Sequence, residues 1–111
     1  MKLSEVKGER VFTVIADIIE PIASIALDDD AAKLFKREAV PEGLTPWQFF
    51  LTRVRESLPV LVRTHKDDLC TILAAIGGVT VDEYVEGLSL DKFMADIIEL
   101  LTDGDFRGFF A

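Results

Sequence analysis

His65 and Cys70 are the only histidine and the only cysteine of the chain, and they are the residues that could perform nucleophilic catalysis. A cysteine nucleophile is activated when a neighbouring imidazole takes its proton, so the two side chains must face each other. Five positions separate them, which is about 140° around a helix. We therefore expect a polar histidine in the first turn of a helix and a small buried cysteine. With no Ser-His-Asp arrangement and no glycine-rich phosphate loop, the sequence predicts neither an enzyme nor a cofactor.

Two acidic runs, Asp28-Asp29-Asp30 and Asp67-Asp68, are the residues that could bind a divalent cation. A calcium loop needs oxygen ligands at alternating positions and a glycine that permits a sharp turn. Neither run has this pattern. The first run precedes Ala31, and acidic residues are favourable at a helix N-terminus. The sequence thus predicts a helix start there and no metal site.

The three arginines Arg53, Arg55 and Arg63, with His65 and Lys66, form the one basic cluster of the sequence. Arg53 and Arg55 flank an apolar valine, so we expect both to point away from the core. Two interpretations stay open. The cluster is either a solvated helix face or a surface that docks onto the acidic C-terminal third of a neighbouring copy. In the second case, contact between unlike patches would propagate into a ring or a spiral.

The C-terminus carries three phenylalanines, Phe106, Phe109 and Phe110, within six residues of the end. Chain ends are usually solvated, but three aromatic rings favour an apolar environment. Either the rings fold back onto the core of the protein, or residues 104–111 form an interaction tail that binds another chain. We predict that truncation after Gly104 abolishes client binding or self-association and leaves the fold intact, whereas unfolding would show that the rings belong to the core.

The composition limits the partners. The net charge is −8, and the residues from Thr80 onward hold eight acids and two bases. Phosphate backbones are repelled by such a surface, so we expect no nucleic-acid ligand and a basic partner instead. Half of the 111 residues are apolar, which is a high share for one small domain. The surplus suggests packing in a homo-oligomer or against a client protein.

The sequence also predicts a cytoplasmic protein that does not enter a membrane. The longest stretch without a charged residue has 13 residues, from Leu69 to Val81, whereas a membrane span needs about 20. The N-terminus has no apolar segment typical of a secretory signal. A single cysteine allows no internal disulfide, in keeping with a reducing compartment.

The apolar spacing predicts an all-α fold, a compact bundle of five to seven short helices in a single domain over residues 1–111. The first helix has its apolar stripe at Val11, Ile15, Ile18, Ile22 and Ile25. The next long helix presents a core face with Trp47, Phe50, Leu51, Val54, Leu58 and Leu61. The last long helix has the clearest stripe, at Leu90, Phe93, Met94, Ile97, Ile98 and Leu101.

Capping residues predict where these helices begin and end. Thr45 with Gln48 and Thr80 with Glu83 form capping boxes, and Ser89 caps the last long helix. Gly77-Gly78 and Gly87 end helices. We expect Pro21 to kink or break the first helix and to begin a second one, and Pro59 to kink or end the helix that starts after Thr45. Thr64 is the predicted cap of the helix that follows.

Four segments together resemble the small tail assembly chaperones encoded by tailed phages and prophages of Gram-positive bacteria. The similarity runs across nearly the whole chain and is a pattern of helices, prolines and glycines. The segments are residues 3–10 (LSEVKGER), 16–22 (ADIIEPI), 58–66 (LPVLVRTHK) and 72–79 (ILAAIGGV).

The resemblance implies an all-α protein that coats the tape measure protein and helps to recruit tail tube subunits. The family often makes a short chain and a longer one extended by ribosomal frameshifting, and residues 108–111 would lie at the end of the short form or close to the junction. The resemblance brings no catalytic residues with it.

Two further functions remain open. An acidic DNA mimic would need carboxylates spaced like phosphates on one face, and the apolar stripes of the C-terminal third leave limited room for them. Another helical adaptor or structural subunit, binding a host protein, would show the same composition. We expect the tape measure protein, the tail tube protein and further copies of the chain to be the partners.

Overall fold

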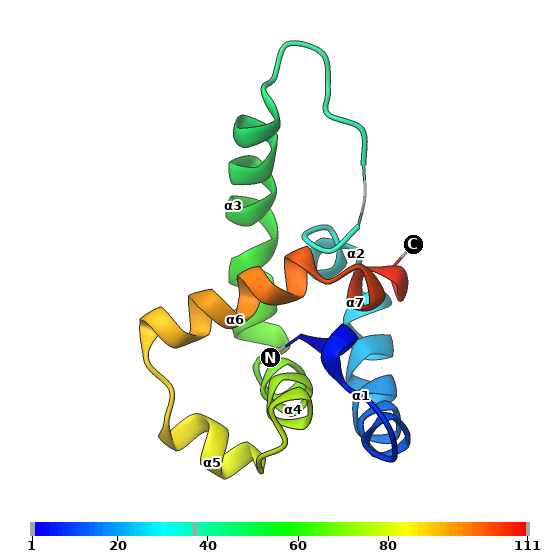
Figure 1. The fold of residues 1–111 in the computed structure, drawn as a ribbon. Coiled ribbons are helices and arrows are strands. Elements are labelled where there is room, and N and C mark those ends of the chain that lie inside the picture. Colours follow the sequence, from blue (N-terminus) through cyan, green and yellow to red (C-terminus); the bar gives the residue numbers. More distant parts are fainter. Residues whose placement is uncertain (1, 37, 111) are drawn as a thin grey trace.

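The computed structural model describes residues 2–36 and 38–110, and these form an all-α bundle (Figure 1). The predicted fold class is confirmed. A short 3-10 turn, η1 (Leu3–Glu5), precedes seven α-helices. The helices are α1 (Arg10–Ala26), α2 (Asp29–Ala32), α3 (Pro46–Thr64), α4 (Lys66–Gly77), α5 (Val81–Glu86), α6 (Leu90–Thr102) and α7 (Gly104–Gly108).

The predicted helix starts are confirmed where a side chain caps the helix. Thr45 and Gln48 form a complete capping box at the start of α3, and Thr80 and Glu83 form one at the start of α5. Ser89 accepts a hydrogen bond from the Lys92 amide and begins α6. Asp28 caps α2, so the first acidic run starts a helix as expected.

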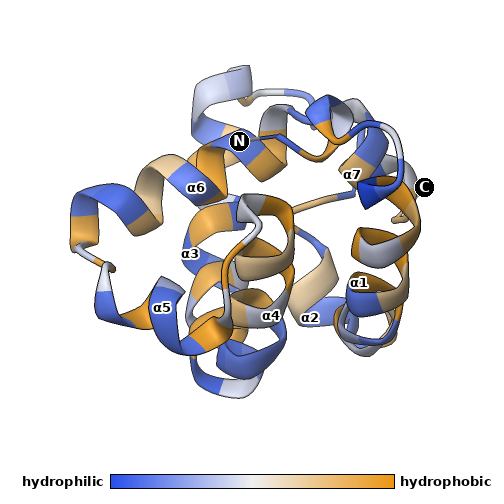
Figure 2. Cartoon of the chain, turned by 60° about the horizontal axis from the view of Figure 1, so that its bottom comes forward, coloured by the Kyte–Doolittle hydropathy of each residue, from blue (hydrophilic) through white to orange (hydrophobic). Residues whose placement is uncertain are grey.

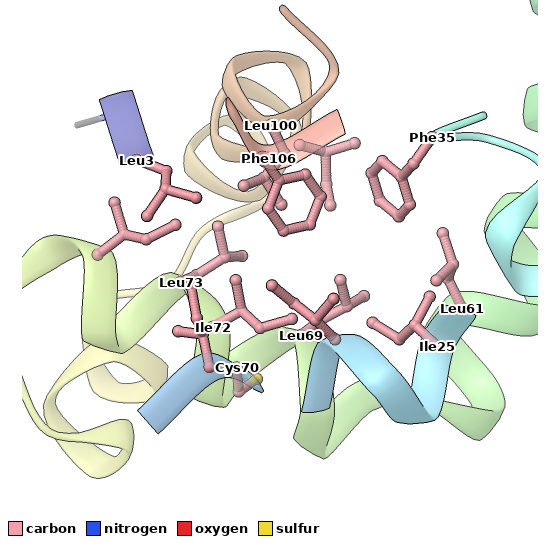
Figure 3. Packing of buried hydrophobic residues seen from close by; sticks show 14 of the residues in the cluster. Leu3, Ile25, Phe35, Leu61, Leu69, Cys70, Ile72, Leu73, Leu100 and Phe106 are labelled. Atoms are coloured by element: carbon pink, nitrogen blue, oxygen red, sulfur yellow. The ribbon is translucent and has the colours of Figure 1, made fainter. Parts of the chain in front are cut away.

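The core lies where α1 packs along α4, and α2, α3, α6 and α7 close over this pair. Ile18 and Ile25 of α1 and Ile72 of α4 have no exposed surface. Figure 3 shows Ile25, Leu61, Leu69 and Leu73 converging from α1, α3 and α4. The buried stripe of α1 consists of Val14, Ile18, Ile22 and Ile25. Val11 and Ile15, which the sequence predicts to be in this stripe, remain more than a third exposed.

Neither interior proline breaks its helix. Helix α1 is continuous through Pro21 and α3 through Pro59, so the predicted second helix starting at Pro21 is wrong. An interior proline costs about 3 kcal/mol because one backbone hydrogen bond is lost. In α1, Ile18 and Ile22 are buried on either side of Pro21, and their packing holds both turns in place. Tertiary contacts thus outweigh the local effect.

His65 joins α3 to α4 and replaces Thr64, the predicted cap, at the start of α4. Its side chain is buried and contacts two carboxylates. Nδ1 lies 2.9 Å from Oδ2 of Asp68, and Nε2 lies 2.9 Å from Oδ2 of Asp28, which precedes α2. The expectation of a polar histidine in a first turn is therefore corrected. His65 is a buried junction that ties α2 to the α3–α4 corner.

The C-terminus folds back onto the core through Asp103. This carboxylate is buried and begins α7, because Oδ1 accepts hydrogen bonds from the amides of Asp105 and Phe106. Its Oδ2 accepts a hydrogen bond from the Ser4 amide at 3.0 Å and so joins the two ends of the chain. Phe106 then points to Phe35, as Figure 3 shows.

The N-terminal half of α3 projects away from the rest of the bundle (Figure 1). The molecule is accordingly elongated, with extents of 45 × 27 × 22 Å. Trp47 lies on this projection and is 65% exposed, although the sequence predicts it in the core. It stacks on Phe50 of the same helix, with ring centroids 5.7 Å apart. The apolar face of α3 reaches the core only from its middle onward, where Leu61 is fully buried.

Candidate functional site

An apolar groove lies between α4, α5 and the beginning of α6, and we call it the α5 groove. Its volume is about 380 Å³. The floor comes from α4, one wall from α5, and the other walls from α3, α6 and the loop before α6. The apolar lining residues are Val62, Leu69, Cys70, Val81, Val85, Leu88 and Phe93. A groove of this size and lining can take apolar side chains from one face of a helix.

Local sequence signals position the walls of the α5 groove. Gly78, with φ of 72°, ends α4 in the left-handed conformation, and Thr80 then starts α5. Val81 and Val85 are one turn apart, so both face the groove. Tyr84 is buried, does not line the groove, and donates a hydrogen bond from its hydroxyl to Oδ2 of Asp96 at 2.7 Å. This bond joins α5 to α6, and both helices contribute lining residues to the groove.

The chemistry of the groove is apolar and its surroundings are acidic. Cys70 is buried at the floor, and burial raises the pKa of its thiol, so the thiol stays protonated at neutral pH. Asp82 and Glu86 of α5 are exposed and follow the lining residues Val81 and Val85 in the sequence, while Lys66 and Asp67 lie at the edge of the groove. A partner helix with an apolar face and basic flanks would match this arrangement.

The three C-terminal phenylalanines differ in their exposure to solvent. Phe106 has no exposed surface and Phe110 is buried with it, so for these two rings the interpretation that they fold back onto the core is correct and the exposed anchor is wrong. Phe109 is 38% exposed and lines a shallow groove with Val11 and Ile15 of α1. Of the predicted tail over residues 104–111, only Phe109 offers an aromatic ring to a partner. Ala111 lies outside the described residues.

The arginines of the predicted basic cluster also lie in different environments. Arg55 and Arg63 are exposed on α3, as expected. Arg53 instead turns inward, lies over the Phe49 ring at 5.3 Å and donates a hydrogen bond to the Lys36 carbonyl. The prediction that it points to solvent is wrong, because Arg53 and Arg55 lie about 200° apart on the helix. The three arginines thus do not form one patch.

Arg53 and Arg107 line a second groove, of about 380 Å³, with Phe49, Phe50 and Leu101. Arg107 donates from Nε to the Phe35 carbonyl at 3.3 Å, whereas Nε of Arg53 is buried and has no partner among the described residues. Burial lowers the pKa of the Arg53 guanidinium. The negative charge of Glu38 raises this pKa, and the positive charge of Arg107 lowers it. Two arginines and one acid, Glu38, therefore line this groove.

His65 and Cys70 do not come together as a catalytic pair. Both ring nitrogens of His65 are held by carboxylates, and Cys70 lines the α5 groove. Within residues 2–36 and 38–110, no three histidine, cysteine or acidic side chains converge as metal ligands would. The two acidic runs serve instead as helix starts and as partners of His65.

Sequence reasoning missed the α5 groove and one exposed apolar stripe of α1. The signal for the groove is weak, because Val81 and Val85 lie in a helix of only six residues. The signal for the stripe is stronger. Phe12, Ala16, Ile19 and Ala23 recur at intervals of four, three and four residues, and all four are exposed.

No protein-family model, curated protein or solved structure matches this chain. The resemblance to tail assembly chaperones therefore stays a prediction. None of the helices that the structure describes combines the length and the apolar character needed to cross a lipid bilayer.

Proposed function

We propose that the protein is a phage tail assembly chaperone that self-associates, binds the tape measure protein and aids the recruitment of tail tube subunits. The observation that carries the proposal is the α5 groove, an open apolar hollow on a helical bundle. Its exposed lining residue Val85 is half accessible to solvent. Apolar surface gathered in a groove favours a binding role, whereas scattered apolar side chains do not.

The chemistry of the groove suggests the form of the client. A tape measure protein is expected to be long and helical, with an apolar side. Such a helix would place apolar side chains on Leu69, Val81 and Val85, and basic flanking residues near Asp82 and Glu86. One small groove binds weakly. Many copies bound along one client would raise the affinity through multivalency.

The alternative is an acidic helical adaptor, or a DNA mimic, that binds a host protein. The distribution of apolar residues on α6 disfavours the mimic. Leu90, Met94 and Ile98 form an exposed row along this helix, which interrupts the carboxylates of the C-terminal third. An adaptor would use the same α5 groove for a different helical partner.

Gel filtration tests the proposal. The protein is mixed with a helical fragment of the tape measure protein encoded in the same genome, and with a scrambled peptide of equal composition that lacks apolar periodicity. We expect the elution volume to shift with the fragment and not with the scrambled peptide. A protein that elutes unchanged with both, at concentrations well above micromolar, would contradict the proposal.

A further inference from the structure

Helix α1 carries two apolar stripes, and only one of them faces the core. The buried stripe packs against α4. The second stripe, which we call the α1 seam, consists of Phe12, Ala16, Ile19 and Ala23. Phe12 is 75% exposed and Ile19 is 49% exposed. The spacing of four, three and four residues is that of a helix that packs along another helix.

Acidic residues border the α1 seam. Glu9 lies one turn before Phe12, and Glu20 lies one turn after Ala16, so both carboxylates flank the apolar row. Both are exposed. The basic residue of α1, Arg10, points elsewhere and donates hydrogen bonds to the carbonyls of Ala75 and Ile76 on α4. A helix that packs on the seam should therefore bring basic residues with it.

The projecting half of α3 has the complementary character. Trp47, Leu51 and Arg55 follow one another at intervals of four residues, so they form a single row along the helix. All three are exposed. Arg55 forms no ion pair with another described residue, and the same holds for Glu20. The projection seen in Figure 1 leaves this row accessible to another molecule.

We propose that the α3 row of one copy packs on the α1 seam of a second copy, with Arg55 beside the carboxylate of Glu20. This inference rests on the self-association in the proposed function and names its two surfaces. Like-charged contacts disfavour the other pairings, because two α1 seams would bring acids together and two α3 rows would oppose arginines. Contact between unlike surfaces leaves one of each free, so the assembly grows into a ring or an open chain.

The acceptor surface differs from the one that the sequence indicates. One of the two interpretations that the sequence leaves open docks the arginine cluster onto the acidic C-terminal third of the neighbouring copy. The α1 seam offers both a continuous apolar row and flanking carboxylates, and it leaves the α5 groove free for the client. Self-association and client binding can then occur together, as multivalent binding requires.

Charge reversal tests the inference. Sedimentation velocity is measured across a concentration series for Arg55→Glu, for Glu20→Arg and for their equimolar mixture. Each single variant should weaken self-association by about tenfold or more, because a rim charge then faces a like charge. The mixture should recover association, since each reversed surface meets an oppositely charged one. Arg63→Glu is the matched control, because it makes the same charge change about 160° around α3 from Trp47.

Three results would overturn the inference: a wild-type protein that stays monomeric, single variants that associate like Arg63→Glu, or a mixture without recovery. Circular dichroism confirms that the variants remain helical. Client binding is measured on the same samples. A monomeric chain that still binds the tape measure fragment contradicts this inference alone, whereas an assembled chain that ignores the fragment contradicts client binding alone.

Discussion

The ring of Phe106 meets the ring of Phe35 edge to face, with centroids 5.1 Å apart and an angle of 82° between the planes. Phe110 packs on both rings, at 5.1 Å from Phe35 and 5.4 Å from Phe106. The three rings join the C-terminus to the segment after α2. This cluster makes the last turn of the chain part of the core.

Phe106→Ala should therefore destabilise the protein. Removing a buried phenylalanine costs about 3–5 kcal/mol, because the lost ring leaves a cavity. Phe109→Ala is the matched control and should cost under about 1 kcal/mol, since that ring is partly solvated. Urea unfolding followed by circular dichroism measures both free energies. Equal values for the two variants would show that the Phe35–Phe106 contact contributes little.

Truncation after Gly104 should unfold the protein or leave it barely stable. The sequence alone predicts that the truncated chain keeps its fold. The structure gives the opposite expectation, because the truncation removes two buried rings and the donors that satisfy Asp103. Thermal unfolding of the truncated chain measures the effect, and a melting temperature close to that of the full chain would refute this role of the tail.

His65 should make stability depend on pH. Burial alone would lower the pKa of His65, but the hydrogen bonds to Asp68 and Asp28 outweigh it and raise the pKa above its ordinary value of 6.5. A doubly protonated ring donates to both carboxylates, whereas a neutral ring donates to one. The stabilisation is therefore fully present below pH 6.5 and is lost as the pH rises through the raised value.

The same junction should weaken in acid. The hydrogen bond to His65 lowers the pKa of Asp28 below its ordinary 3.8, so this contribution is lost as the pH falls through the lowered value.

The charge of His65 is tested above this acidic range. Unfolding free energies of the wild type and of His65→Gln are compared at about pH 5.5 and about pH 8.5. The difference in unfolding free energy between the wild type and His65→Gln should be larger at the lower pH. A difference independent of pH would contradict the role of the charged imidazole.

Cys70 reports on the α5 groove. Burial raises the pKa of its thiol, so a thiol reagent should modify the folded protein much more slowly than the unfolded chain. A bound client helix should slow the reaction further, because Cys70 lies at the floor of the groove. Labelling is followed by mass spectrometry with and without the tape measure fragment. A rate that the fragment leaves unchanged would place the client elsewhere.

The sequence predicts those parts of the fold that local contacts determine. The capping boxes of Thr45 and Thr80 are correct because cap and partner are three residues apart. Pro21 and Trp47 are misjudged because distant packing decides their environment. The contact between Asp28 and His65 links residues 37 positions apart, and no sequence pattern indicates it.

The candidate site is harder to predict for the same reason. The α5 groove is assembled from four helices, and the hydrogen bond that joins two of them links Tyr84 to Asp96, which no sequence pattern indicates. The α1 seam, in contrast, is visible in the spacing of Phe12, Ala16, Ile19 and Ala23. It is overlooked when the stripe that begins at Val11 is taken as the whole apolar face of the helix.

Calorimetric titration of a tape measure fragment into the wild type, Val85→Gln and Leu27→Gln tests the central claim most directly. Val85 lines the α5 groove, whereas Leu27 is 86% exposed beyond the end of α1, outside the grooves described above. We predict that the fragment binds the wild type and Leu27→Gln with equal affinity and binds Val85→Gln at least about fivefold more weakly, which is about 1 kcal/mol. Equal affinity for all three proteins, or no binding to any of them, would contradict a client site in the α5 groove.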